Sequence, residues 1–183
     1  LDLMIDSAAE ISKHHRDCQF ILPVANTLKP EIFRERLKGN PLNISIVEGK
    51  TYDVMSCCDF LIIASGSATL EAGLLGCPMV IVYRLNFITY WLARLLVKVK
   101  LYGLVNIVAE EEVVTELIQN EATVENITKE TVKILNDPEK HKDMRSRLLQ
   151  VRNSLGEPGV LDRTAMRMLE FLRERRQDEK ISI

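Results

Sequence analysis

Short, almost continuously apolar runs alternate with amphipathic stretches along the first half of the chain. The apolar runs predict buried β-strands at residues 19–25, 43–47, 60–64 and 78–83. The stretches around them predict helices: an opening one that ends near His15, then residues 29–37, 51–58 and 68–75. This α-β-α-β alternation predicts an α/β fold, a parallel sheet with helices on both faces and right-handed crossovers.

The second half of the chain has a mainly helical pattern. It predicts helices at residues 87–99, 113–119, 128–136 and 138–155, and a last helix from Asp162 to about Arg175. Gly156, Pro158 and Gly159 break the pattern. We therefore expect a main domain over residues 1–155, followed by a terminal helix and charged tail over residues 156–183. No capping residue precedes the opening helix, so we expect the sequence to begin inside a helix of a longer chain.

Composition narrows the function classes. The 183 residues carry 24 basic and 26 acidic side chains, a net charge of −2, which argues against a nucleic-acid-binding protein. No apolar run without charges is long enough to span a bilayer. The four cysteines lack metal-site spacing and are expected to be buried, reduced thiols: Cys18, Cys57, Cys58 and Cys77.

The turn after the third predicted strand carries the clearest chemistry. Ser65, Gly66 and Ser67 lead directly into a helix, whose first N–H groups and dipole favour an anion. In an open parallel sheet, ligands bind beyond the carboxyl ends of the strands, so a phosphate or diphosphate fits here. Glu71 lies in the first turns of the helix, where its carboxylate can accept from ribose hydroxyls. The same pattern also fits an ordinary helix-capping turn, and it matches neither a P-loop nor a dinucleotide fingerprint.

Residues 87–100, FITYWLARLLVKVK, form a second distinctive stretch. From residue 84 to residue 100 there are four basic residues and no acidic one. A basic helix with aromatic side chains can lie on an anionic membrane surface. A helix buried in the domain, with its two basic ends reaching solvent, explains the same pattern. The candidate membrane or acyl-chain contacts are Phe87, Tyr90, Trp91, Arg94 and Lys98.

Three stretches resemble the lipid-A-disaccharide synthase family: SGSATLEAGLLGCPMVIVYR, TYWLARLLVKV and VNIVAEEEVVTELIQ. The family motif is close to S-G-T-A-T-L-E-A, and Ser67 replaces its first Thr. Val105 and Thr115 also depart from the family, which usually has Pro at both positions. The resemblance covers nearly the whole chain and corresponds to the C-terminal half of the enzyme.

This resemblance implies one Rossmann-like, UDP-sugar-binding half of a GT-B-type glycosyltransferase. The family joins UDP-2,3-diacylglucosamine to 2,3-diacylglucosamine 1-phosphate, which gives the lipid A disaccharide phosphate and UDP. It implies no metal or redox cofactor and no nucleic acid. The acylated donor and acceptor place the full-length enzyme in the cytoplasm, peripheral to the inner face of the inner membrane. The resemblance leaves open whether the protein forms a homodimer.

The resemblance also assigns site residues by motif. Those implied to line or support the UDP site are Ser65, Gly66, Ser67, Ala68, Thr69, Glu71, Tyr83, Arg84, Asn106, Glu116 and Gln119. The family's Gly-Ser-Arg phosphate loop and the acidic general base would precede Leu1. We therefore expect no catalytic residue in this chain and no activity from it alone.

Two alternatives stay open at the level of sequence. Another GT-B donor domain, such as an undecaprenyl-linked N-acetylglucosaminyltransferase, would share the fold. A nucleotide-binding module without catalytic activity would share the anion-binding turn. The pairing of SGSATLE with TYWLARLLVKV favours the lipid A enzyme.

Overall fold

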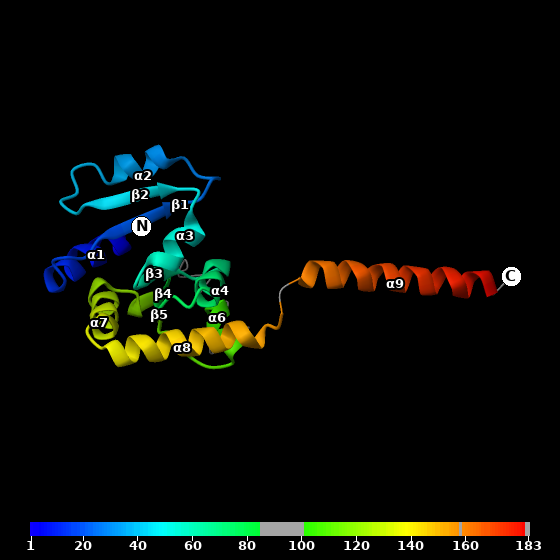
Figure 1. Cartoon of the computed structure of the whole chain (residues 1–183). Coiled ribbons are helices and arrows are strands. Elements are labelled where there is room, and N and C mark those ends of the chain that lie inside the picture. The colour runs from blue at the N-terminus through cyan, green and yellow to red at the C-terminus, as the bar shows by residue number, and fades with distance from the viewer. Residues whose placement is uncertain (85–100, 158, 182–183) are drawn as a thin grey trace. The chain divides into compact units, whose positions relative to one another are not determined.

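The computed structural model describes residues 1–84, 101–157 and 159–181 (Figure 1). The chain separates into two compact units, Leu1–Arg152 and Asn153–Ile183. The first unit holds all five strands of the described residues and the nucleotide-site residues predicted from the sequence. The second unit contains the long helix α9.

Five strands of the first unit are parallel to their neighbours. They are β1 (Phe20–Val24), β2 (Ile44–Glu48), β3 (Leu61–Ala64), β4 (Met79–Tyr83) and β5 (Glu116–Ile118). β1 pairs with β2, and the other three form a sheet in the order β3-β4-β5. The predicted α/β class with parallel strands is therefore confirmed, although the strands form two hydrogen-bonded sheets and not one.

Helices connect and flank these strands (Figure 1). Their bounds are α1 Asp2–His14, α2 Pro30–Arg36, α3 Thr51–Cys57, α4 Ser67–Leu74, α6 Leu104–Ala109, η1 Gln119–Glu121, α7 Val124–Leu135 and α8 Pro138–Ser154. The helices predicted in the first half and that at residues 138–155 are confirmed to within a few residues. α7 begins earlier than predicted because Thr123 caps it, accepting a hydrogen bond from the Asn126 N–H.

The predicted helix at residues 113–119 is wrong. Its last part is strand β5, which pairs with β4 in the register Ile81↔Glu116 and Tyr83↔Ile118. The apolar spacing of this segment fits a short helix, but pairing with β4, whose first four residues are buried, takes precedence over the local pattern. The preceding helix, α6, was not predicted.

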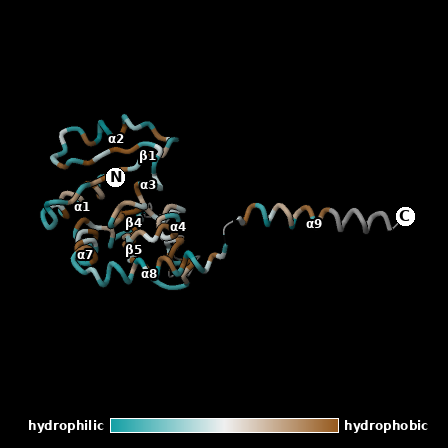
Figure 2. Tube along the Cα trace, in the orientation of Figure 1, coloured by the Kyte–Doolittle hydropathy of each residue, from teal (hydrophilic) through white to brown (hydrophobic). Residues whose placement is uncertain are grey.

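The core of the first unit surrounds β4. Met79, Val80 and Ile81 expose none of their surface, and apolar residues gather around this strand in Figure 2. Helix α4 packs against α6 at Gly73, where a Cβ atom would lie 2.6 Å from the Val105 Cγ2. Close packing at this glycine fixes α4 beside the carboxyl end of β3.

The second unit consists of a turn and helix α9, Val160–Ile181 (Figure 1). This helix begins two residues before the predicted start and continues past the predicted end. Several large apolar side chains on it are exposed, including Leu161, Met168 and Phe171. Within the described ranges, no helix combines the length and apolar character that crossing a bilayer requires.

Candidate functional site

Three neighbouring strands end at one edge of the β3-β4-β5 sheet. Ala64 lies opposite Val82, and Tyr83 lies opposite Ile118, so the chain leaves all three strands at a similar level. The residues that follow are Ser65, Arg84 and Gln119. The structure therefore brings together three of the predicted site segments at the carboxyl edge, where ligands bind in parallel α/β sheets.

Helix α4 starts at this edge without a side-chain cap. Gly66 is its N-cap residue, and its backbone is extended. A Cβ atom added to Gly66 would meet nothing within 4 Å, so the space in front of it is open. The Thr69 N–H donates to the Gly66 carbonyl oxygen at 3.2 Å, whereas the Ser67 and Ala68 N–H groups precede the first intrahelical hydrogen bonds. Ser67 is exposed and Ala68 is half-buried beside them. The arrangement can hold an anion.

Thr69 has an internal role at this turn. Its side chain is fully buried, and its hydroxyl donates to the Gly66 carbonyl oxygen at 2.8 Å. Ser65 is also tied down: its backbone N–H donates to the Val82 carbonyl, and its hydroxyl donates to the Tyr102 carbonyl at 3.2 Å. These two residues fix the shape of the turn, whereas Gly66 and Ser67 form its accessible part.

Glu71 lies one turn further along α4 and is half-buried. A hydrogen bond with its carboxylate raises the pKa of the Tyr52 hydroxyl. Tyr52 comes from α3, which packs against α4, and its side chain is exposed. This partner could not be predicted from local sequence patterns, because the two residues lie on separate helices. The structure thus pairs a carboxylate with a phenol beside the α4 turn.

Asn106 and Glu116 form a buried network behind the site. The Glu116 carboxylate accepts from the Tyr102 and Gly103 N–H groups at 2.7 and 2.8 Å and from the Asn106 Nδ2 at 2.8 Å. The Asn106 Oδ1 accepts from the backbone N–H groups of Val113 and Val114. The Asn106 amide is fully buried, and these bonds lie within the chain. Both side chains therefore support the loop edge.

The remaining predicted residues lie at the ends of β4 and β5. Tyr83 is the last residue of β4 and is half-buried. Arg84 is exposed, and its guanidinium donates to the Ala122 carbonyl. Gln119 has a φ of 53°, which turns the chain sharply after β5 into η1. The candidate acyl-chain contacts lie outside the described residues: Phe87, Tyr90, Trp91, Arg94 and Lys98.

The cysteines differ in burial more than their sequence surroundings suggest. Cys77 is buried, and burial raises the pKa of its thiol to about 12. Cys57 is exposed, which corrects the expectation that these thiols are buried. Among the residues of the described ranges, no cluster of His, Cys, Asp or Glu is arranged to hold a metal ion.

Comparison with known proteins extends this picture. The family model described as lipid-A-disaccharide synthetase matches residues 1–166.

The chain belongs to the lipid-A-disaccharide synthetase family.

Curated relatives of the lipid-A-disaccharide synthetase family align with most of the chain. The lipid-A-disaccharide synthase of Nitrosococcus oceani is 38% identical over 156 residues, which cover 85% of this chain and 40% of that protein. The synthase of Geobacter metallireducens is 39% identical over 174 residues, 95% of this chain and 45% of that protein. The synthase of Syntrophus aciditrophicus is 35% identical over 175 residues, which cover 95% of this chain and 46% of that protein. The chain therefore spans less than half the length of these relatives.

Proposed function

We propose that this chain is the nucleotide-sugar-binding half of a lipid A glycosyltransferase. In the full-length protein it would bind UDP-2,3-diacylglucosamine for transfer to 2,3-diacylglucosamine 1-phosphate, with release of UDP. The observation that carries the proposal is the uncapped start of α4 at the edge where β3, β4 and β5 end. Family membership supports the class of substrate.

The diphosphate is assigned to the turn at residues 65–68. Two phosphate groups need donors and positive potential, and the first N–H groups of α4 supply both without a side-chain competitor. The open space in front of Gly66 lets a phosphate reach the backbone. Arg84, which is exposed at the end of β4, adds a cation at the same sheet edge. The dianionic ligand is thus held by the start of one helix and one guanidinium.

The ribose is assigned to Glu71. A carboxylate can accept from two neighbouring hydroxyls, and charge-assisted hydrogen bonds are stronger than neutral ones. In the structure, the Glu71 carboxylate accepts a hydrogen bond from the Tyr52 hydroxyl. Because the Tyr52 side chain is exposed, it can turn away when ribose hydroxyls take its place. Glu71 thereby selects a nucleotide that carries both hydroxyls.

The chemistry of transfer is shared with the other part of the full-length protein. This chain would bind and orient the donor, and the general base and the acceptor site would come from residues beyond it. Holding donor and acceptor across a cleft converts a bimolecular reaction into an effectively intramolecular one, a gain of about 7–11 kcal/mol in favourable cases. We propose further that residues 87–100 contact the membrane or the acyl chains, which brings the acylated donor to the site.

Substitution of Gly66 by Ala tests the diphosphate site. The backbone of Gly66 is extended and a Cβ atom would touch nothing, so the variant should fold with an unchanged melting temperature. In the full-length protein the added methyl group would stand where the phosphate approaches, and we expect UDP affinity to fall about tenfold, or 1.4 kcal/mol. Calorimetric titration of the full-length protein with UDP measures this change in affinity.

Uridine serves as the matched ligand for this experiment. It lacks the diphosphate, so its weaker affinity should be the same for the wild type and for Gly66→Ala. If the variant binds UDP as tightly as the wild type does, the diphosphate lies elsewhere. An equal loss for UDP and uridine would place the nucleoside, and not the diphosphate, at Gly66.

A further inference from the structure

Helix α4 has different neighbours on its two sides. Glu71 and Gly73 are two residues apart, so the directions in which they face differ by about 200°. Glu71 faces α3, where the Tyr52 hydroxyl donates to its carboxylate. Gly73 faces α6, where the Val105 Cγ2 would lie 2.6 Å from an added Cβ atom. Helix α4 therefore lies between α3 and α6.

This order gives the proposed donor a direction. Its ribose is assigned to Glu71, on the α3 side, and its diphosphate to the turn at residues 65–68. In a nucleotide-sugar, the ribose and the sugar are attached to opposite ends of the diphosphate. A diphosphate that crosses the start of α4 from the ribose therefore leads toward α6. In this arrangement the sugar, and the acyl chains bound to it, come next to α6.

The start of α6 is held beside the diphosphate turn. The Ser65 hydroxyl donates to the carbonyl oxygen of Tyr102 at 3.2 Å, one residue before the N-cap residue Gly103. The Glu116 carboxylate accepts from the N–H groups of both Tyr102 and Gly103. These bonds place the first turn of α6 next to the residues that are assigned to the diphosphate.

The outward face of α6 is apolar. Val105 and Asn106 expose none of their surface. By contrast, Leu104 exposes 38% and Ile107 exposes 44%. These two residues are three positions apart and share the face opposite to the buried pair. Because helical side chains lean toward the N-terminus of their helix, both lean toward the sheet edge at which α6 begins. We call this pair the α6 strip.

We propose, building on the function proposed above, that the α6 strip holds an acyl chain of the donor sugar. Singly exposed apolar side chains are common on protein surfaces, but this pair lies beside a site whose proposed ligand carries hydrocarbon. A chain laid over both side chains removes apolar surface of ligand and protein from water, which is favourable. Residues 87–100, the proposed membrane contact, end shortly before Gly103, so the two proposed contacts adjoin in the sequence.

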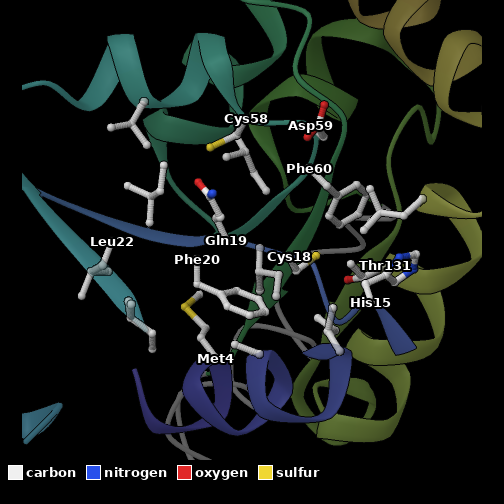
Figure 3. Close-up of a pocket in the computed structure, with 18 of the residues that line it drawn as sticks. Met4, His15, Cys18, Gln19, Phe20, Leu22, Cys58, Asp59, Phe60 and Thr131 are labelled. Atoms are coloured by element: carbon white, nitrogen blue, oxygen red, sulfur yellow. The ribbon is translucent and has the colours of Figure 1, made fainter. Parts of the chain in front are cut away.

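An apolar cavity elsewhere in the first unit does not continue the site. Its walls come from β1, β3, α1 and α3, with Phe20, Leu22 and Phe60 among the lining side chains (Figure 3). Among the described residues that line it, none belongs to the turn at residues 65–68 or to α6. An acyl chain that follows the diphosphate away from this turn therefore meets the α6 strip before it could reach the cavity.

A series of donor analogues tests the α6 strip in the full-length protein. The series runs from UDP through UDP-glucosamine to UDP-2,3-diacylglucosamine with acyl chains from butanoyl to octanoyl, and calorimetric titration gives each affinity. Wild-type affinity should rise by up to about fourfold for each methylene group that becomes buried. The double variant Leu104→Gln, Ile107→Gln should bind the octanoyl analogue about tenfold more weakly than the wild type does, and UDP equally well.

Leu28→Gln combined with Ile32→Gln is the matched control. It also replaces one leucine and one isoleucine that are exposed, here at the start of α2, which packs on β2. Glutamine is close to leucine in helix propensity, and all four side chains are already exposed. Both double variants should therefore keep the wild-type melting temperature, and the control should bind every analogue as the wild type does.

The contrary outcomes separate the acyl contact from the nucleotide site. If the α6 variant gains affinity with chain length as steeply as the wild type does, while both bind UDP, the acyl chain lies elsewhere and only this inference fails. A melting temperature about 5 °C or more lower, for the α6 variant alone, would show that protein and not ligand covers the strip. If the wild type itself does not bind UDP, the proposed function fails, and the acyl contact fails with it.

Discussion

At the residue scale, the Asn106 amide connects several segments behind the site edge through its hydrogen bonds. It bridges the Glu116 carboxylate to the backbone of Val113 and Val114 in a place without solvent. In turn, Glu116 binds the N–H groups at the start of α6. One amide therefore ties a helix start to the strand beside the site, and satisfied polar networks of this kind fix a unique local structure.

Replacing Asn106 by Ala should destabilise the protein. The change removes one acceptor and one donor and leaves the Val113 and Val114 N–H groups buried without partners. We expect the free energy of unfolding to fall by about 2–3 kcal/mol, because a stranded buried polar group costs about 1–3 kcal/mol. Urea unfolding of the full-length protein measures the change.

The Asn106→Asp variant is the matched control, with a pH dependence of its own. It keeps the acceptor oxygen but places a second carboxyl beside Glu116, so burial and the neighbouring charge raise the pKa of the introduced group. A raised pKa means that stability is retained at low pH and lost as pH rises through that pKa. The variant should therefore approach wild-type stability near pH 4 and lose most at pH 7. A pH-independent loss would contradict the assigned network.

At the element scale, the first half of the chain was predictable and parts of the second were not. Strands β1 to β4 are short apolar runs bounded by turn residues, so their positions follow from local sequence. β5 has only three residues, and its identity depends on pairing with β4, which is distant in sequence. The N-cap residue of α6 is Gly103, which has no side chain to cap the helix, and Glu116 from β5 accepts from its N–H group. Long-range contacts of this kind leave no local signal.

The site residues likewise fall into those that local sequence predicts and those that depend on tertiary contacts. Ser65, Gly66 and Ser67 could be placed from the sequence because a strand, a turn and a helix start follow one another there. The Glu71–Tyr52 contact could not, since it joins two helices through tertiary packing. Asn106 and Glu116 came from family resemblance alone, and their supporting role became evident only from their hydrogen bonds.

The packing of α4 against α6 gives a prediction at this scale. In Gly73→Ala the new Cβ atom would lie 2.6 Å from the Val105 Cγ2, which forces one helix to move. Overpacking typically costs about 1–3 kcal/mol, although the higher helix propensity of Ala returns about 1 kcal/mol. We expect a lower urea midpoint and weaker UDP binding, since α4 carries the site turn.

Val105→Ala supplies the matched partner for this variant. Alone, Val105→Ala should lower the free energy of unfolding because it leaves a small cavity. Combined with Gly73→Ala, it removes the Val105 methyl group that the new Cβ atom would meet. The double variant should therefore lose less stability than the sum of the two single changes. Strict additivity would show that the two residues do not press against each other in solution.

At the scale of the whole molecule, the first unit is an α/β unit with a candidate site at one edge of the β3-β4-β5 sheet. The α4 turn, Arg84 and Glu71 supply contacts suited to a nucleotide diphosphate. Binding of the acylated donor adds a further requirement, contact with the membrane, which the proposed function assigns to residues 87–100.

Charge reversal of Arg94 and Lys98 tests that membrane contact. Each basic residue near an anionic surface contributes about 1 kcal/mol, within a Debye length of about 10 Å at 0.1 M salt. Loss of both should weaken binding of the full-length protein to vesicles with anionic headgroups by about 30-fold, with an unchanged melting temperature. The matched control reverses the charges of Lys129 and Lys142, which are exposed on α7 and α8, and should bind as the wild type does.

Trp91 fluorescence should shift to the blue when vesicles are added. If both double variants bind equally well, or Trp91 reports no change, residues 87–100 belong to the core and the membrane contact lies elsewhere.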